Sequence, residues 1–235
     1  MSERRLVVVD DAEVLAERAA RLIAAAPRER NARVCLSGGA TPRAAYERLA
    51  GLGAAWDRLH LYFGDERCVP PDAEGSNYRM VREALLDRVD IPDDNVHRVP
   101  GELPAPDAAR AAEDDMRRSF GDVPLPRFDL VLLGMGEDGH TASLFPGTGG
   151  GDVTDRLLIP VHRPELPQPW RVSVTMPVVN AAWHAVFLVS GAAKGPVLRR
   201  AWEGDARLPA GRVDPRGDLT FLVDRDAARA AGLEG

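Results

Sequence analysis

Residues 32–42 read ARVCLSGGATP, and this stretch carries the clearest fold signal in the chain. Its first five residues are apolar except for one arginine, which predicts a buried strand that ends at Ser37. Two glycines follow, and then Thr41 and Pro42 predict the start of a helix, with the threonine as N-cap and the proline in the first turn. A buried strand that leads through a glycine turn into a helix is typical of an α/β protein with a parallel sheet.

The same alternation of apolar strands and amphipathic helices runs along the whole chain. We expect strands over residues 5–10, 32–39, 59–67, 95–99, 128–134, 156–162, 171–175, 185–191 and 219–224. We expect helices over residues 12–26, 78–89, 109–120 and 194–202, a further helix that starts at about residue 41, and a terminal helix after residue 224. This order predicts a three-layer α/β/α fold of modified Rossmann-like type around a largely parallel sheet. The span 146–169, rich in glycine and proline, is interpreted as a surface excursion, so residues 1–235 are expected to form one domain.

Composition narrows the class of protein. The 235 residues are 45% hydrophobic and carry a net charge of −6, which argues against a nucleic-acid binder. Cys35 and Cys68 fit neither a disulfide framework nor a metal knuckle. We expect no signal peptide and no membrane span, and therefore a soluble cytoplasmic protein, either a monomer or a homodimer.

Polar and glycine residues follow four of the expected strands, over residues 37–42, 64–67, 134–140 and 190–195. In open parallel sheets, ligands bind beyond the carboxyl ends of the strands. Because these four stretches each come at such an end, they are expected to meet at one edge of the sheet. We therefore predict a binding site there.

Two of these stretches suit an anion. Backbone N–H groups at Ser37, Gly38 and Gly39 can approach a phosphate, and Thr41 can cap the next helix or donate its hydroxyl. A plain strand-to-helix turn explains the same residues, although the paired glycines favour anion binding. Lys194, the only lysine in the chain, stands at an expected helix start, where the helix dipole disfavours a cation, and this mismatch points to a functional charge.

Arg67 and Arg171 lie at the ends of two expected strands. Most arginines in a chain of this kind face solvent. Their place beside the predicted site is the reason to include both as candidate ligands of an anion.

Residues 134–147 read GMGEDGHTASLFPG, directly after an apolar strand. The pattern G-x-G-x-x-G suggests a dinucleotide site, but Pro146 ends any helix within two turns and the acid expected about 20 residues later is missing. Two acids inside the loop would also repel a pyrophosphate. We therefore reject an NAD site.

Acid–base chemistry fits this stretch better. His140 titrates near neutral pH in its ordinary state, and Asp138 or Asp65 can orient its imidazole or hold a water beside it. A histidine that caps a short helix, with Asp138 supporting the turn, is the simpler alternative. A metal bound by these three side chains is conceivable, but their spacing is not diagnostic of one.

Several motifs together resemble the 6-phosphogluconolactonase family, within the wider group that includes glucosamine-6-phosphate isomerases and deaminases. The resemblance rests on LSGGATPRAAYERLA (36–50), LYFGDERCVPPDAEGSNYRMVREALL (61–86), FDLVLLGMGEDGHTASLFPG (128–147), RVSVTMPVVNAAWHAVFLVSGAAKGPVL (171–198) and LPAGRV (208–213). It implies the fold of that superfamily and hydrolysis of 6-phospho-D-glucono-1,5-lactone in the oxidative pentose phosphate pathway. It also implies that no metal and no organic cofactor takes part.

The resemblance assigns roles to residues that match the family motifs. His140 corresponds to the general base and Asp138 to the acid of the same motif. The substrate-binding set that it implies consists of Ser37, Gly38, Gly39, Thr41, Arg67, Asn77, Arg171 and Lys194, with Asp65 as a further acid of the site.

Two other functions stay open from the sequence. Aminosugar-phosphate isomerase/deaminase relatives carry a glutamate just before the proline of the histidine motif, where this chain has Phe145. A non-catalytic sugar-phosphate-binding protein is the second alternative.

Overall fold

A seven-stranded sheet forms the centre of the protein in a computed structural model that describes residues 3–27, 31–121 and 123–234. Every adjacent pair of its strands is parallel. The order is β1 (Arg4–Val9), β10 (Asp218–Asp224), β9 (His184–Val189), β6 (Leu130–Leu133), β2 (Ala32–Leu36), β3 (Leu59–Phe63) and β5 (Val96–His97). Strand β6 is buried along its whole length and β9 along all but its first residue, because helices cover both faces of the sheet centre.

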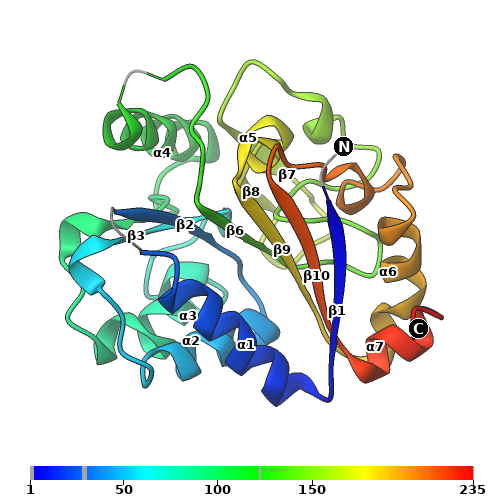
Figure 1. Ribbon diagram of the computed structural model, residues 1–235. Helices are drawn as coiled ribbons and strands as arrows, with labels where there is room; N and C mark the ends of the chain where they lie inside the picture. The colour runs from blue at the N-terminus through cyan, green and yellow to red at the C-terminus, as the bar shows by residue number, and fades with distance from the viewer. Residues whose placement is uncertain (1–2, 28–30, 122, 235) are drawn as a thin grey trace.

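Helices lie on both sides of this sheet, which confirms the expected α/β/α layers (Figure 1). One layer consists of α1 (Ala12–Ala24), α2 (Ala40–Leu49) and α3 (Asn77–Ala84), which pack in that order. The other contains α4 (Ala105–Phe120), α5 (Met176–Ala181) and α6 (Gly195–Trp202), and α7 (Arg225–Ala230) packs beside α6. Chain direction along the sheet reverses after β5, so right-handed crossovers place the later helices on the opposite face.

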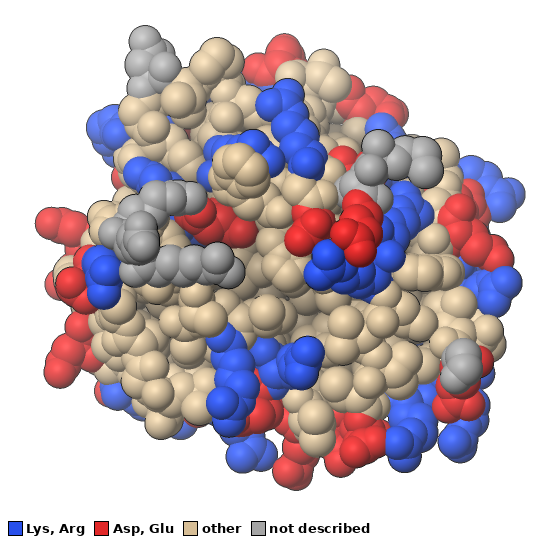
Figure 2. Space-filling view, viewed as in Figure 1, with Lys and Arg blue, Asp and Glu red and all other residues tan. Residues whose placement is uncertain are grey.

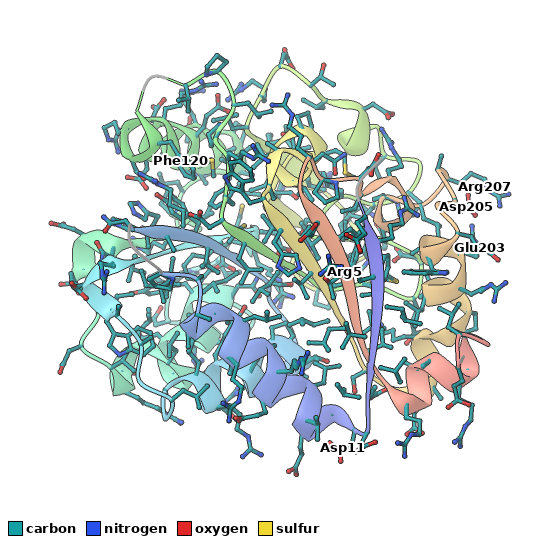
Figure 3. The ribbon with its side chains drawn as sticks, in the orientation of Figure 1. Arg5, Asp11, Phe120, Glu203, Asp205 and Arg207 are labelled. Carbon is teal, nitrogen blue, oxygen red and sulfur yellow. The ribbon has the colours of Figure 1, made fainter. Side chains whose placement is uncertain are left out.

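The ends of the helices follow local chemistry, and several of them differ from expectation. The Asp11 carboxylate caps α1 by accepting hydrogen bonds from the N–H groups of Glu13 and Val14, both at 2.9 Å (Figure 3). Helix α2 begins two residues early, with Gly39 rather than Thr41 as N-cap, because the backbone turns there through a φ of 109° that glycine adopts readily. The expected helix over 78–89 is helical only to Ala84 and continues as a short 3₁₀ turn.

A second, smaller sheet corrects part of the expected topology. Strands β7 (Leu158–His162) and β8 (Trp170–Val174) were expected in the parallel sheet, but they pair antiparallel with each other and with β4 (Asp65–Arg67), in the order β4-β8-β7. Alternation of apolar residues predicts strands but not their partners. Helix α4 packs on this small sheet, so part of the span 146–169 is covered structure rather than a surface excursion.

Basic and acidic side chains are interspersed over the face shown in Figure 2. In the part of the chain that the structure describes, no helix is both long enough and apolar enough to cross a membrane.

The lowered pKa values of two histidines, His60 and His184, predict how the free energy of unfolding depends on pH. Burial lowers the pKa of His184, whose Nε2 lies 2.9 Å from the Thr220 hydroxyl, and burial together with the neighbouring His97 and Arg33 lowers the pKa of His60. The folded state therefore takes up protons less readily than the unfolded chain, so the free energy of unfolding should fall as pH drops below the ordinary histidine pKa of about 6.5. Urea unfolding at pH 7.0 and at pH 5.5 measures this loss.

The matched control is the double variant His60→Asn/His184→Asn. We expect it to lose less stability than the natural chain between the two pH values. An equal loss would show that other groups are responsible for the acid sensitivity.

Candidate active site

The loops after β2, β3, β6 and β9 meet at one edge of the sheet, because these four strands are neighbours and run parallel. They enclose a hollow of about 370 Å³, here called the site pocket. Among the residues that line it are Ser37, Gly38, Gly39, Thr41, Asp65, Arg67, Asn77, His140, Arg171 and Lys194. The lining thus includes every predicted site residue except Asp138, whose carboxylate contacts the imidazole of His140.

A second hollow of about 380 Å³ lies at the opposite edge of the sheet, beside Asn31, Trp183 and His184. Volume alone therefore does not select the site. The site pocket differs in having polar loops from four strands directed into one space, which is the usual arrangement of a ligand site in this class of sheet.

The loop after β6, residues 134–140, is here called the histidine loop and is a tight turn closed by backbone hydrogen bonds. The N–H of Gly136 donates to the His140 carbonyl at 2.9 Å, and the N–H of Gly139 donates to the Gly136 carbonyl at 3.0 Å. A Cβ at Gly136 would lie 2.1 Å from the His140 Nδ1, and Gly139 has a φ of 86°. Both glycines are therefore needed for the imidazole to sit where it does.

Asp138 orients this imidazole. Its Oδ1 lies 2.6 Å from the Nδ1 of His140 and accepts the His140 backbone N–H at 3.1 Å. Burial raises the pKa of Asp138, but the hydrogen bonds from His140 and the attraction of its imidazole outweigh burial and hold the pKa below its usual value. Asp138 is thus a carboxylate at neutral pH, which assigns the proton to Nδ1 and leaves the Nε2 lone pair free.

Neighbouring residues fix the histidine loop from two further sides. The Phe145 ring, 4% exposed, packs on the imidazole with ring centroids 4.5 Å apart. Behind the turn, the N–H of Ala210 donates to the Gly139 carbonyl at 3.0 Å, and the Leu208 side chain fills the space beside Gly139. The motif LPAGRV contains Leu208 and Ala210, but their contact with the histidine loop could not be predicted from it, because that contact depends on the tertiary fold.

The glycine loop after β2 is tied to the histidine loop. The Ser37 hydroxyl accepts the N–H of Gly134 at 3.1 Å, and the Tyr46 hydroxyl both accepts the Ser37 N–H and donates to the Ser37 carbonyl. Helix α2 starts directly after Gly39, so its first N–H groups and its positive end lie at the site pocket. Thr41 lies in this first turn.

Two arginines stand side by side on the small sheet. Arg67 and Arg171 are directly opposite each other in the β4–β8 ladder, and both line the site pocket. Arg171 is 8% exposed, and burial together with repulsion from Arg67 lowers its pKa. The Nε of Arg67 is buried and has no hydrogen-bond partner among the residues that the structure describes. Like charges placed in this way are unfavourable unless an anion joins them, so this part of the pocket suits an anionic group.

Lys194 approaches the pocket from β9. It is the N-cap residue of α6, which begins at Gly195, one residue later than expected, and its Nζ lies 4.0 Å from the Glu137 carboxylate of the histidine loop. The ammonium group and the imidazole therefore lie at the same edge of the sheet. An anion bound at Lys194 would compete with the exposed Glu137 for this charge.

Asp65 differs from one expectation. Its carboxylate accepts hydrogen bonds from the Ser143 hydroxyl at 2.7 Å and from the Asn77 amide at 3.2 Å, and not from His140. Of the two candidate acids, Asp138 is the one whose carboxylate contacts the imidazole. Asp65 lines the site pocket as a buried acid whose hydrogen bonds join three loops.

Within residues 3–27, 31–121 and 123–234, no group of three or more histidine, cysteine or acidic side chains is arranged to hold a metal ion. The expectation that the reaction needs no metal stays a prediction.

The comparisons with known proteins agree on one family. The model of "Glucosamine-6-phosphate isomerases/6-phosphogluconolactonase" matches residues 9–222. The chain belongs to this family. A 6-phosphogluconolactonase of Nostoc sp. is 42% identical over 208 residues, which cover 86% of this chain and 83% of the relative, and one of Synechocystis sp. is 40% identical over 200 residues, with coverages of 83% and 82%.

A solved structure extends this family match to the fold. The 6-phosphogluconolactonase of Thermotoga maritima superposes with a TM-score of 0.83 at 31% identity, over 95% of this chain and 100% of that one. Membership of the glucosamine-6-phosphate isomerase/6-phosphogluconolactonase family agrees with the rejection of an NAD site. The glycine pattern of residues 134–139 leads here into a short bridge between Thr141 and Leu144 rather than into a helix.

Proposed function

We propose that this protein hydrolyses 6-phospho-D-glucono-1,5-lactone to 6-phospho-D-gluconate, a step of the oxidative pentose phosphate pathway. One observation carries the proposal. The imidazole of His140, held by Asp138 through Nδ1, shares a single hollow with Lys194, Arg171 and the glycine loop. The names of the relatives support the same substrate.

In the proposed reaction, the Nε2 of neutral His140 takes a proton from a water molecule as that water attacks C1 of the lactone. Asp138 stabilises the imidazolium that forms. Arg67 and backbone N–H groups of the glycine loops stabilise the negative oxygen of the tetrahedral intermediate. The bond between C1 and the ring oxygen then breaks, and the imidazolium returns its proton to that oxygen.

The proposal also assigns a binding site to the phosphate group of the lactone. Lys194, Arg171 and the N–H groups of residues 37–41 would hold it at a distance from the reacting carbon. Binding energy from a group that does not react can align C1 with the water and the imidazole. Asn77, which lines the same pocket, is proposed as a further substrate contact.

Phe145 argues against aminosugar-phosphate isomerase/deaminase activity. That reaction moves protons between carbons and needs additional acid–base groups. Here the position of the glutamate expected in isomerases holds a buried aromatic ring against the imidazole. Lactone hydrolysis needs only one activated water molecule and fits this environment.

We also propose that residues 1–235 form one domain and that the protein works in the cytoplasm. In support of the first, one continuous cluster of buried apolar residues includes side chains from both sheets and from helices of both layers.

The purified protein, with no metal added, tests the proposed function. We expect it to accelerate ring opening of the phosphorylated lactone far beyond the spontaneous rate in the same buffer, and to leave glucosamine 6-phosphate unchanged. Ligand uptake without turnover would identify a binding protein. Release of ammonia from glucosamine 6-phosphate would identify an isomerase/deaminase.

Replacement of Lys194 by methionine should weaken binding of the phosphorylated lactone. Loss of one hydrogen bond to a charged group costs about 1.5–3 kcal/mol, so KM should rise at least about tenfold. The rate with unphosphorylated gluconolactone should stay the same, because that substrate has no phosphate to lose. Steady-state kinetics with both substrates checks this, and an unchanged preference for the phosphorylated lactone would remove Lys194 from the phosphate site.

A further inference from the structure

Glu66 is a buried acid that has no part in the proposed reaction, although both of its chain neighbours line the site pocket. It is 2% exposed and lies in β4 between Asp65 and Arg67. Its Oε1 accepts the N–H groups of Arg67 and Asn77, both at 2.7 Å, and its Oε2 accepts the Tyr78 N–H at 2.8 Å and the Ser76 hydroxyl at 3.1 Å. A carboxylate has about four acceptor positions, and here all are used.

These bonds hold the first turn of α3 on the edge of β4. The Ser76 hydroxyl, which donates to Glu66, also caps α3 by accepting the N–H of Arg79 at 3.1 Å. The Arg67 backbone is held by the same carboxylate, and its guanidinium donates to the Gly75 carbonyl just before α3. Glu66 therefore sets the position of the chain on both sides of the gap between β4 and α3.

A chain of buried hydrogen bonds continues from Glu66 toward the histidine loop. The Asn77 amide, 3% exposed, donates to the Asp65 carbonyl at 2.9 Å and to its carboxylate at 3.2 Å. The other carboxylate oxygen of Asp65 accepts the Ser143 hydroxyl at 2.7 Å, three residues after His140. Buried polar networks of this kind specify one arrangement only when every member is satisfied.

The Asn77 amide also packs on the glycine loop. A Cβ at Gly38 would lie 2.1–2.7 Å from the side-chain amide atoms of Asn77, so the two are in direct contact. A shift of the first turn of α3 would therefore move both Asn77 and the wall of the pocket that Gly38 forms.

Glu66 has no salt bridge within the described part of the chain, which is unusual for an acid at this depth. Burial raises its pKa, and the three backbone N–H groups that it accepts oppose this rise. An acid buried without an ion-pair partner is a poor way to stabilise a fold. Polar groups that cost stability in this way are expected beside functional sites.

We propose that Glu66 is a positioning residue for the reaction. It fixes Asn77 between Gly38 and Asp65, and it fixes Arg67 at the pocket, and so shapes the surface that receives the substrate. This inference rests on the proposed function, because it assumes that the pocket binds the phosphorylated lactone.

Glu66→Gln is the test substitution. The amide places N–H donors against two of the four groups that now donate to Glu66, so the first turn of α3 has to move. We expect KM for the phosphorylated lactone to rise about tenfold, the change that a loss of about 1.4 kcal/mol in binding produces. The value of kcat should fall by a smaller factor, because Arg67 is the only group of the proposed reaction that Glu66 contacts directly in the described chain, whereas the pair of His140 and Asp138 is held by its own loop.

Glu113→Gln is the matched control. Glu113 is another buried acid, 7% exposed, and is not among the residues that line the site pocket. Its carboxylate pairs with Arg117 and Arg156 and accepts the N–H groups of Leu157 and Leu158. It should lose thermal stability with KM unchanged. If Glu66→Gln likewise loses stability with KM unchanged, the role of Glu66 is only structural and the inference is overturned.

Ser76→Ala keeps the inference testable if Glu66→Gln does not fold. It removes one donor and adds none, so it should raise KM by a smaller factor with kcat retained, and an unchanged KM would overturn the inference. The natural protein is assayed beside each variant. If it does not hydrolyse the lactone, the proposed function itself has failed, whereas an active natural protein with a fully active Glu66→Gln variant refutes only the role of Glu66.

Discussion

His140→Ala is expected to lower kcat for the phosphorylated lactone by a factor of roughly 10²–10⁴, the contribution of one positioned general base. KM should change little, since the groups proposed to hold the phosphate lie on other loops. The expectation follows from the hydrogen bond that joins Nδ1 to Asp138 and so leaves Nε2 as the proton acceptor. Stopped-flow or pH-stat kinetics, corrected for spontaneous hydrolysis, measures both constants.

His184→Asn is the control for this variant. His184 begins β9 and lies at the opposite edge of the sheet, so its replacement should leave kcat unchanged. Near-normal turnover by His140→Ala would remove His140 as the base. Binding of 6-phosphogluconate by the inactive variant would show that the pocket is intact.

Asp138→Asn is expected to lower kcat by a factor of roughly 10²–10⁴ as well. The amide cannot stabilise the imidazolium by charge, and its N–H₂ can donate to Nδ1, which shifts the proton to Nε2 and blocks the base. KM should again stay close to its natural value. The variant differs from the natural protein by one atom, so steady-state kinetics reports on charge and tautomer rather than on packing.

Glu137→Gln is the matched substitution in the same loop. The Glu137 side chain is exposed and makes its contact with Lys194, not with the imidazole. We expect it to retain kcat. Equal losses in the two variants would mean that loop charge in general, and not the pairing with His140, supports catalysis.

The convergence of the site could be predicted from the sequence, because it depends on a topological rule. Residues such as Ser37 and Lys194 are more than 150 positions apart, yet each follows an apolar strand, and parallel strands end at the same edge. The short spacing between Asp138 and His140 likewise predicted their contact, since the turn between them is local.

Other features depend on tertiary pairing and could not be predicted in this way. The apolar pattern of 156–162 and 171–175 indicates strands, but only the fold shows that the two pair antiparallel with each other and that the second pairs with residues 65–67. The hydrogen bond between Ser143 and Asp65 joins positions 78 residues apart, so the sequence could not identify Ser143 as the partner of Asp65. Gly39, and not Thr41 as expected, is the N-cap of α2, because the chain enters the helix through the positive φ of this glycine.

The most direct measurement is a crystal structure of His140→Ala with bound 6-phospho-D-gluconate. The account predicts a phosphate in contact with Lys194, Arg171 and the glycine loop, and a C1 carboxylate within roughly 3–3.5 Å of where the imidazole Nε2 stands in the natural protein. A product molecule bound in the hollow beside Trp183 and His184, or one with its phosphate at the histidine loop and C1 away from it, would contradict the account.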